Sequence, residues 1–359
     1  ELFHGPTLAF KDIAMQLLGG FYEYYLNNHN EKINIVVATS GDTGAAAIDA
    51  IKGKNNINIF VLHPNNRISK VQRKLMTTGK EKNVFNIAVE GNFDDCQNLV
   101  KAMFADKSFS NKIKMSGVNS INWARIIAQS VYYFYCYYLI EDNNNPINFS
   151  VPTGNFGDVY AGYLAKKIGL PVNKFIVATN QNDILHRAIS KGTYDVEKVA
   201  ETISPSMDIQ LASNFERLIY DLNNHNDEKT IKAMKDIKKN GKYLISDENL
   251  NKINNHFLSS SMNENEVLNI IKNVHSKFDM ILDPHTAIGY GAFDKVKLKG
   301  NNIVLATAHP CKFPDAIDKA INIKSKLPNE LLHVLDEKEN YDIVENNLDK
   351  IKNHIKERV

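Results

Sequence analysis

The chain has 359 residues, and 43% of them are hydrophobic, which predicts roughly two to three domain-sized units with sizeable cores. Its 43 basic and 41 acidic side chains give a formal net charge of +2, so we expect no nucleic-acid or membrane partner. The cysteines, Cys96, Cys136 and Cys311, form neither a disulfide framework nor a zinc motif, which favours the reducing cytoplasm.

The first distinctive stretch is FHGPTLAFKD, residues 3–12, which places Lys11 behind a Gly-Pro-Thr turn and an apolar triplet. A lysine in this position is either a solvated residue in the first turn of a helix or a partly buried amine. Burial disfavours the ammonium form, lowers the pKa of the amine and frees its lone pair for Schiff-base chemistry. The stretch alone leaves both interpretations open.

Several stretches share one order, in which a short apolar strand is followed by a polar turn and an amphipathic helix. They begin at Ile33, Val84, Ile147, Lys174, Phe278 and Asn302. Such alternation predicts an α/β fold, with helices on both faces of parallel sheet.

The most apolar run, Ile126 to Ile140, is shorter than the ~20 residues that span a bilayer. It predicts a buried, aromatic-rich helix, with Trp123 and the tyrosines at 132–138 in the core.

The Asn-rich stretch from Asp142 to Pro146 predicts a linker. It separates a smaller α/β subdomain at 28–142 from a larger one at 146–325. Residues 194–277 are polar and mainly helical in pattern, and they predict an insertion in the larger subdomain.

Three strand ends carry unusual polar sequences, at 39–43 (TSGDT), 153–158 (TGNFGD) and 307–310 (TAHP). Ligands of open α/β sheets lie at the carboxyl ends of strands, where helix N-termini present unpaired N–H groups. The recurrence of polar turns at equivalent positions therefore predicts one composite site.

Gly154 and Gly157 allow backbone N–H groups to approach an anion, and the following helix adds its positive end, which suits a phosphate. Neither G-x-x-x-x-G-K-[ST] nor G-x-G-x-x-G occurs, which disfavours a nucleoside triphosphate and a nicotinamide dinucleotide. A reactive lysine together with a phosphate-binding loop describes pyridoxal 5'-phosphate. In that case the hydroxyl of Thr307 could face the pyridine nitrogen and leave it largely unprotonated.

Several stretches resemble, in order and spacing, the threonine synthase family of fold type II pyridoxal-phosphate enzymes: FHGPTLAFKD, ATSGDTGAAA, NSINWARI, SVPTGNFGDVYAGYLAKKIGLP and ATAHPCKFPDAI. The resemblance covers Phe3 to about Ile321. It implies that residues 1–359 form a catalytic unit of two α/β subdomains with the cofactor in the cleft between them. It also implies that Lys11 forms the Schiff base and that five further residues bind the cofactor: Gly154, Asn155, Phe156, Asp158 and Thr307.

The resemblance implies O-phospho-L-homoserine as the substrate and a lyase reaction of threonine biosynthesis, in which β,γ-elimination of phosphate is followed by addition of water. The second phosphate needs its own receptor, which Asn119, Ser120 and Arg125 could form. An arginine at a helix start can also be a surface ion-pair partner. Ser40 and Thr43 could hold the substrate carboxylate at a helix N-terminus.

Two departures from the family pattern stand out. The family's N-terminal domain has no counterpart here, and the chain begins with Glu1, so we expect that an N-terminal segment is missing. Many related enzymes have Asn where this chain has Asp42, whose role and charge stay open. The oligomeric state is also open.

Two alternative functions remain. An amino-acid dehydratase or β-replacement enzyme of the same fold needs no second phosphate receptor, and an inactive homologue could bind a ligand without turnover. His4, His285 and His309 lack the spacing of a metal site, so we predict no metal. Histidines in turns more often cap helices or bond the backbone.

Overall fold

A computed structural model describes residues 1–140 and 145–359, so part of the predicted linker, Asp142 to Asn144, lies outside the described residues. The chain forms two compact units. The N-terminal unit consists of Phe3–Ala124 with Lys326–Val359, and the central unit consists of Arg125–Ser325 with Glu1–Leu2. The division falls after Ala124, and the C-terminal residues rejoin the unit that the N-terminal residues begin.

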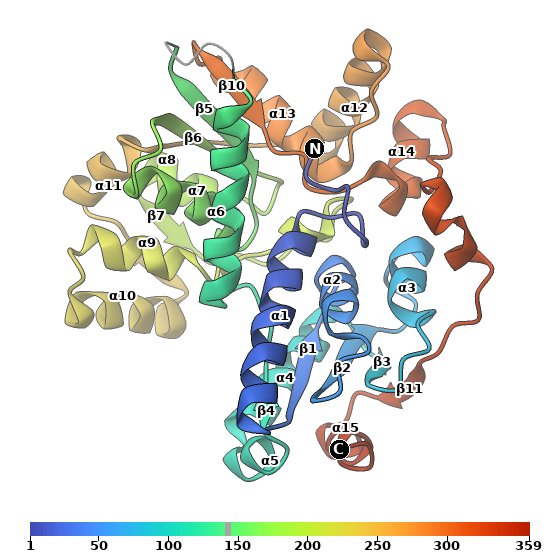
Figure 1. Ribbon diagram of the computed structural model, residues 1–359. Helices are drawn as coiled ribbons and strands as arrows, with labels where there is room; N and C mark the ends of the chain where they lie inside the picture. Colours follow the sequence, from blue (N-terminus) through green and yellow to red (C-terminus); the bar gives the residue numbers. More distant parts are fainter. Residues whose placement is uncertain (141–144) are drawn as a thin grey trace. The chain divides into compact units, whose positions relative to one another are not determined.

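The N-terminal unit is built on a five-stranded parallel sheet with the order β11-β3-β2-β1-β4 (Figure 1). Its strands are β1 (Ile33–Ala38), β2 (Ile57–Pro64), β3 (Val84–Glu90), β4 (Met115–Ser116) and β11 (Asp342–Glu345). Strands β1 and β3 begin where the sequence predicted them, whereas β2 was not predicted.

Helices cover both faces of this sheet. They are α1 (Lys11–His29), α2 (Asp42–Ile51), α3 (Lys70–Thr77), α4 (Phe93–Ala105), α5 (Lys107–Lys112) and α15 (Leu348–Lys356), with a 3₁₀ helix, η3, at Asn329–Leu335. The two-residue period of a strand sends Ile35 and Val37 of β1 into a core with α1 and α2. Val36 points to the opposite face, into a core with α4 and α15.

The central unit contains a four-stranded parallel sheet with the order β10-β5-β6-β9 and a separate antiparallel pair (Figure 1). The sheet strands are β5 (Ile147–Pro152), β6 (Val172–Thr179), β9 (Phe257–Ser261) and β10 (Asn301–Val304), and the pair is β7 (Thr193–Asp195) with β8 (Lys242–Leu244).

The helices of the central unit are α6 (Trp123–Tyr138), α7 (Gly157–Lys167), α8 (Ile184–Lys191), α9 (Phe215–Leu222), α10 (Asp227–Asn240), α11 (Asp247–Asn254), α12 (Glu264–Phe278), α13 (Pro284–Val296) and α14 (Pro314–Ile321), with 3₁₀ helices η1 (Pro205–Met207) and η2 (Pro310–Lys312). The stretch 194–277, predicted to be mainly helical, contains α9, α10, α11 and most of α12, and it also contributes β9 to the main sheet. The strand predicted from Phe278 is absent, because Phe278 ends α12 and the next residues lead directly into α13.

Two kinds of core flank the central sheet. Helices α12 and α13 pack on Ile176 and Ala178 of β6 through aliphatic residues. Aromatic rings form the other core, where Tyr133 of α6 lies edge-on to Phe149 and Phe175 at centroid distances of 4.8 and 5.9 Å.

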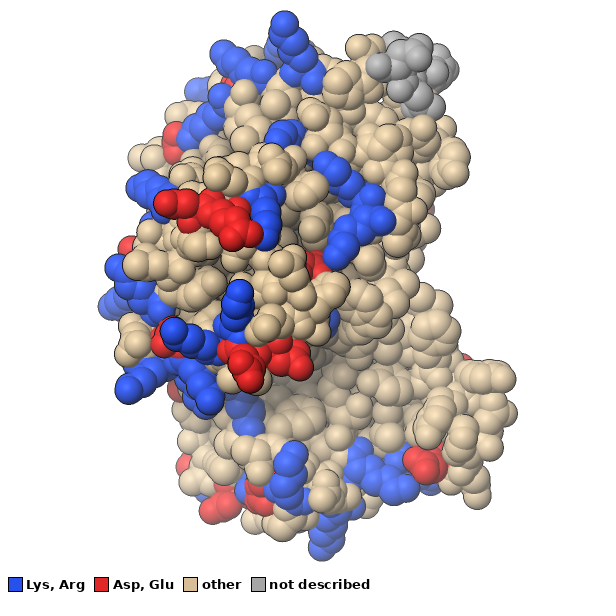
Figure 2. Space-filling view, turned by 90° about the vertical axis from the view of Figure 1, so that its left-hand side faces the viewer, with Lys and Arg blue, Asp and Glu red and all other residues tan. Residues whose placement is uncertain are grey.

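Helix α6 is amphipathic and not buried on all sides. Tyr132 and Tyr133 lie in the core as predicted, but Trp123, Tyr135 and Tyr138 are 43%, 62% and 78% exposed, so the prediction that they are core residues was wrong. None of the helices in the described ranges is long and apolar enough to cross a membrane. Figure 2 shows acidic and basic side chains interspersed on the face that it draws, in keeping with the balanced composition.

Candidate functional site

Lys11 is the first residue of α1, and a closed turn places it there. The backbone N–H of Thr7 donates to Oδ2 of Asp12 at 2.9 Å, and the Thr7 hydroxyl donates to Oδ1. A Cβ at Gly5 would lie 2.4 Å from Oδ2 of Asp12, so the turn requires glycine. The Lys11 residue is only 9% exposed, which favours the partly buried amine over the solvated lysine.

Asp42 lies beside this amine. Its Oδ2 is 3.6 Å from Nζ of Lys11, and its Oδ1 accepts a hydrogen bond of 3.0 Å from Nε2 of Gln72. Gln72 belongs to α3, and the sequence analysis did not predict that it takes part in the site. A Cβ at Gly41, whose φ is +132°, would lie 2.7 Å from the same Nε2, so the glycine makes room for the amide. The carboxylate is therefore fixed near Lys11 from two sides.

The loop before α2 is organised by a buried hydroxyl. Oγ1 of Thr39 accepts hydrogen bonds from the N–H groups of Gly41 and Gly44, at 3.0 and 2.8 Å. Ser40 and Thr43 are only partly buried at the N-terminus of this helix. Their hydroxyls thus remain candidates for binding a carboxylate.

The three residues predicted to bind the second phosphate differ in their burial. Asn119 is exposed and Ser120 is half-buried in a turn closed by the N–H of Asn122 on the Asn119 carbonyl, at 3.1 Å. Arg125, in the first turn of α6, is 3% exposed, and burial lowers the pKa of its guanidinium to about 10. The burial of Arg125 favours a phosphate receptor over a surface ion-pair partner, because an anion interacts more strongly with a guanidinium that is shielded from water.

The loop predicted to hold the cofactor phosphate has a fixed shape. Phe156 adopts a left-handed conformation, with φ 63° and ψ 10°, directly before α7. Its ring is fully buried and lies edge-on to Phe215 at 5.3 Å. The Asn155 carbonyl accepts from the N–H of Asn214 at 3.1 Å, and its Oδ1 accepts from the Ser213 hydroxyl at 2.8 Å.

No side chain in the described part of the chain caps α7 at Phe156. The first N–H groups of a helix have no partner within the helix, and a left-handed residue before them turns neighbouring N–H groups towards one point. The loop therefore offers backbone donors and the positive end of a helix to a phosphate.

Asp158 is a buried carboxyl group in the first turn of α7. The Tyr133 hydroxyl donates to its Oδ1 at 3.1 Å and to its backbone carbonyl at 2.9 Å. Its Oδ2 is buried and has no hydrogen-bond partner within the described residues. Burial raises the pKa of Asp158 to about 7, although the bond from Tyr133 lowers it. The free oxygen fits a group that hydrogen-bonds a ligand.

We expect the free energy of unfolding of the cofactor-free protein to decrease as the pH rises from about 4 to about 7. Asp158→Asn should remove this decrease. The pKa of Asp158 is raised from 3.8 to about 7 in the folded state, so the native state binds more protons than the unfolded state across this window. The free energy of unfolding therefore decreases by on the order of a few kcal/mol as the pH rises to about 7, and it stays constant above that pH.

Equilibrium urea unfolding at pH 5 and pH 8 measures this difference. Tyr133→Phe is the matched control, because loss of its hydrogen bond should raise the pKa of Asp158 and move the decline to higher pH. A decline that persists in Asp158→Asn would assign it to another group.

Thr307 lies beyond β10 and is buried. Its N–H donates to Oγ1 of Thr286 at 3.2 Å. Two of the histidines bond the backbone as predicted: Nε2 of His285 accepts from the N–H of Ser206 at 3.3 Å, and Nδ1 of His309 accepts from that of Cys311 at 3.2 Å. In the parts of the chain that the structure describes, no cluster of three or more His, Cys, Asp or Glu could hold a metal.

Comparison with known proteins identifies two matching families. Residues 1–248 match pyridoxal-phosphate dependent enzymes, and residues 286–355 match the C-terminal part of threonine synthase. Threonine synthase from Pseudomonas aeruginosa is 46% identical over 354 residues, which cover 98% of this chain and 76% of the relative. That from Saccharomyces cerevisiae is 41% identical over 396 aligned positions and covers 100% of this chain and 77% of the relative.

The same relationship holds among solved structures. A pyridoxal-phosphate-bound threonine synthase from Brucella melitensis has a TM-score of 0.96 and 46% identity, covering 100% of this chain and 77% of that one. The Escherichia coli threonine synthase has a TM-score of 0.82 and 29% identity, covering 100% and 78%. A threonine deaminase from Solanum lycopersicum, at 15% identity and a TM-score of 0.57 over 88% and 79%, shares only the fold.

Proposed function

The chain belongs to the threonine synthase family of pyridoxal-phosphate-dependent enzymes, and we propose which of its residues carry out the reaction of that family. This enzyme is a lyase that converts O-phospho-L-homoserine and water to L-threonine and phosphate. The observation that carries this function is 46% identity to a threonine synthase over 98% of the chain.

The central unit supplies a loop that fits the cofactor phosphate. We propose that the N–H groups of residues 154–158 bind it, supported by the left-handed Phe156 and the uncapped start of α7. We also propose that the hydroxyl of Thr307 meets the pyridine nitrogen. When bound, the cofactor supplies an aldehyde for covalent attachment and a ring that accepts electrons from the substrate.

The N-terminal unit supplies the amine. We propose that Nζ of Lys11 forms the covalent link to the cofactor and, once released from it, accepts the proton from Cα of the substrate. Asp42, with Oδ2 at 3.6 Å from this nitrogen, stabilises the ammonium that results. The hydrogen bond from Gln72 keeps the carboxylate in this position.

Substrate binding is assigned to two further groups. We propose that Arg125, with Asn119 and Ser120, binds the phosphate that leaves, because a buried guanidinium offers two parallel donors to it. Ser40 and Thr43 bind the substrate carboxylate at the start of α2. We also propose a cytoplasmic location, supported by cysteines that are all free thiols.

A phosphate-release assay on the purified, cofactor-loaded chain tests this function. O-phospho-L-homoserine should give phosphate and L-threonine in equal amounts. Ammonia and a 2-oxo acid from L-serine or L-threonine, without phosphate release from the phosphorylated substrate, would instead indicate a dehydratase. Cofactor binding without any turnover would indicate an inactive homologue.

A further inference from the structure

The sequence DPHT at residues 283–286 begins α13 and has more hydrogen bonds than a helix cap needs. Asp283 is the N-cap and is 1% exposed. Its Oδ1 accepts from the N–H of His285 at 2.9 Å and from Nδ1 of the same ring at 2.8 Å. Its Oδ2 accepts from the N–H of Thr286 at 3.2 Å and from the Thr286 hydroxyl. One carboxylate thus fixes two buried side chains.

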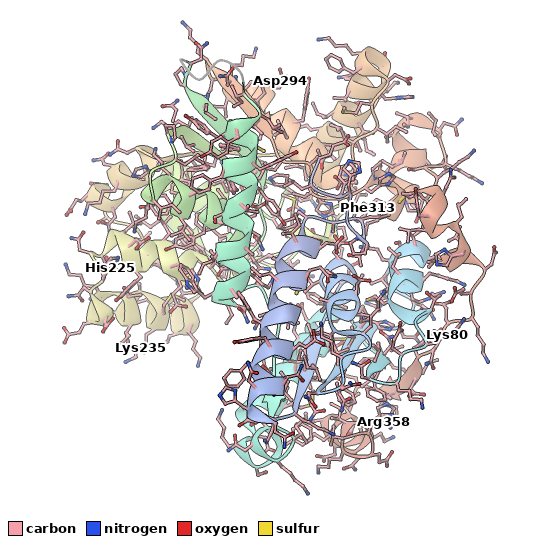
Figure 3. The ribbon with its side chains drawn as sticks, viewed as in Figure 1. Lys80, His225, Lys235, Asp294, Phe313 and Arg358 are labelled. Carbon is pink, nitrogen blue, oxygen red and sulfur yellow. The ribbon has the colours of Figure 1, made fainter. Side chains whose placement is uncertain are left out.

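The branch through His285 ends at the phosphate loop. Because Nδ1 donates to Asp283, Nε2 is the acceptor, and it receives the N–H of Ser206 at 3.3 Å. The ring also packs against Phe313 at 4.9 Å between centroids; Figure 3 labels Phe313 in the segment that leads into α14. A Cβ at Gly154 would lie 2.6 Å from the Ser206 carbonyl oxygen. The backbone at Ser206, which His285 holds in place, therefore packs directly against Gly154 of the phosphate-binding loop.

The branch through Thr286 ends at Thr307. The Thr286 hydroxyl donates its proton to Asp283, so its oxygen is free to accept the N–H of Thr307 at 3.2 Å. All of these residues belong to the central unit, and Asp283, His285, Thr286 and Thr307 are buried. Buried networks whose members are all satisfied hold side chains in one geometry.

We propose that Asp283 is a positioning residue that sets both the phosphate-binding loop at Gly154, through His285, and Thr307, through Thr286. The inference rests on the proposed function in one respect, because it takes the loop and Thr307 as the two ends of the cofactor site. Binding sites require their donors to be held within about 0.5 Å by such supporting contacts.

Capping of α13 would explain only the bonds from Asp283 to backbone N–H groups. A substitution can separate this capping role from the proposed positioning of His285 and Thr286. Ser caps a helix about as well as Asp, so Asp283→Ser keeps the cap. A serine hydroxyl is too short and has too few lone pairs to hold both His285 and Thr286. The matched control is Asn263→Ala, which removes the N-cap of α12, where Oδ1 of Asn263 accepts from the N–H of Glu266 at 3.0 Å.

The measurement is the equilibrium affinity for pyridoxal 5'-phosphate and for pyridoxal, which lacks the phosphate, by fluorescence titration of the cofactor-free chain. Asp283→Ser should weaken pyridoxal 5'-phosphate binding by about tenfold or more, since it disturbs two contacts. Asn263→Ala should lower the unfolding midpoint and leave both affinities unchanged. Wild-type affinity in Asp283→Ser would overturn the proposal.

Two further variants assign the branches. His285→Phe should weaken pyridoxal 5'-phosphate binding by about three- to tenfold and pyridoxal binding much less, because it acts at the phosphate end. Thr286→Val should lower the affinities for both ligands by a similar factor, because it acts through Thr307 at the pyridine ring, which both ligands contain. Equal effects of both variants on both ligands would overturn the two-branch assignment.

These titrations need no turnover, so they are independent of the phosphate-release assay. Normal cofactor affinities in the wild type with no phosphate release would refute the proposed function and leave the role of Asp283 intact. Phosphate release at the normal rate and wild-type affinity in all three network variants would refute the role of Asp283 alone.

Discussion

Lys11→Ala is expected to abolish turnover of O-phospho-L-homoserine and to leave the cofactor bound without a covalent link. The variant removes the amine that attaches to the cofactor and the group that accepts the Cα proton, so no partial activity should remain. The phosphate-binding loop at 154–158 is a separate set of donors, so affinity should persist. Absorption spectra and phosphate release measure the two effects.

Borohydride reduction of the cofactor-loaded wild type, followed by peptide mapping, should place the label on Lys11. The structure sharpens this test, because the described part of the chain contains two further buried lysines, Lys74 and Lys312. Nζ of Lys74 donates to the Glu337 carbonyl at 2.6 Å, so Lys74→Ala is a matched control that should keep full activity. A label on Lys74 or Lys312 would contradict the assignment.

Arg125→Leu is expected to lower kcat/KM for O-phospho-L-homoserine by roughly ten- to hundredfold. The variant removes a charge-assisted contact with the substrate phosphate, worth about 1.5–3 kcal/mol. Leucine suits the buried position, whose present guanidinium has a pKa lowered by burial. Steady-state phosphate release measures the loss. The affinity for pyridoxal 5'-phosphate should hardly change, because the cofactor phosphate has its own loop.

Two controls accompany this variant. Arg125→Lys should recover only part of the activity, because it keeps the charge and loses the two parallel donors. Slow reaction with L-serine, which has no phosphate, should be the same in wild type and Arg125→Leu. Weakened cofactor binding, or unchanged kinetics with O-phospho-L-homoserine, would contradict the role of Arg125 and favour a dehydratase-like site.

The fold was predictable where strand, turn and helix follow one another without interruption. The unit from Ile33 is such a case, since β1 leads through TSGDT into α2. Strand β2 was missed because Asn58 and His63 interrupt its apolar pattern. Asn58 donates a side-chain hydrogen bond to Asn34 at 2.9 Å, and the His63 ring lies edge-on to Tyr341 at 6.1 Å between centroids. The exposure of Tyr135 and Tyr138 depends on which face of α6 packs against the sheet. The aromatic composition of the helix does not indicate which face this is.

The candidate site was predictable only where its residues lie in a motif. Lys11, Asp158 and Thr307 were singled out from turns, strand ends and the family resemblance, their roles stay predictions, and the structure adds that all three are buried. Gln72 was not predicted, and the sequence offered no reason to single out Asp283, because the contacts that draw attention to them cross the fold. Gln72 reaches back 30 residues to Asp42, and His285 bridges 79 residues to Ser206. Such pairings have no local sequence signal.

The return of the C-terminal residues to the N-terminal unit has a consequence for synthesis of the chain. Strand β11 pairs with the edge of β3, Ile351 and Ile355 of α15 complete the core on that face, and Arg73 binds Glu339 at 2.7 Å. On the ribosome, this edge and this core stay open until residues 342–355 emerge, whereas residues 125–325 form a contiguous stretch that can close earlier. An unpaired strand edge invites pairing with other chains. The nascent N-terminal unit therefore exposes an unpaired strand edge until β11 is synthesised.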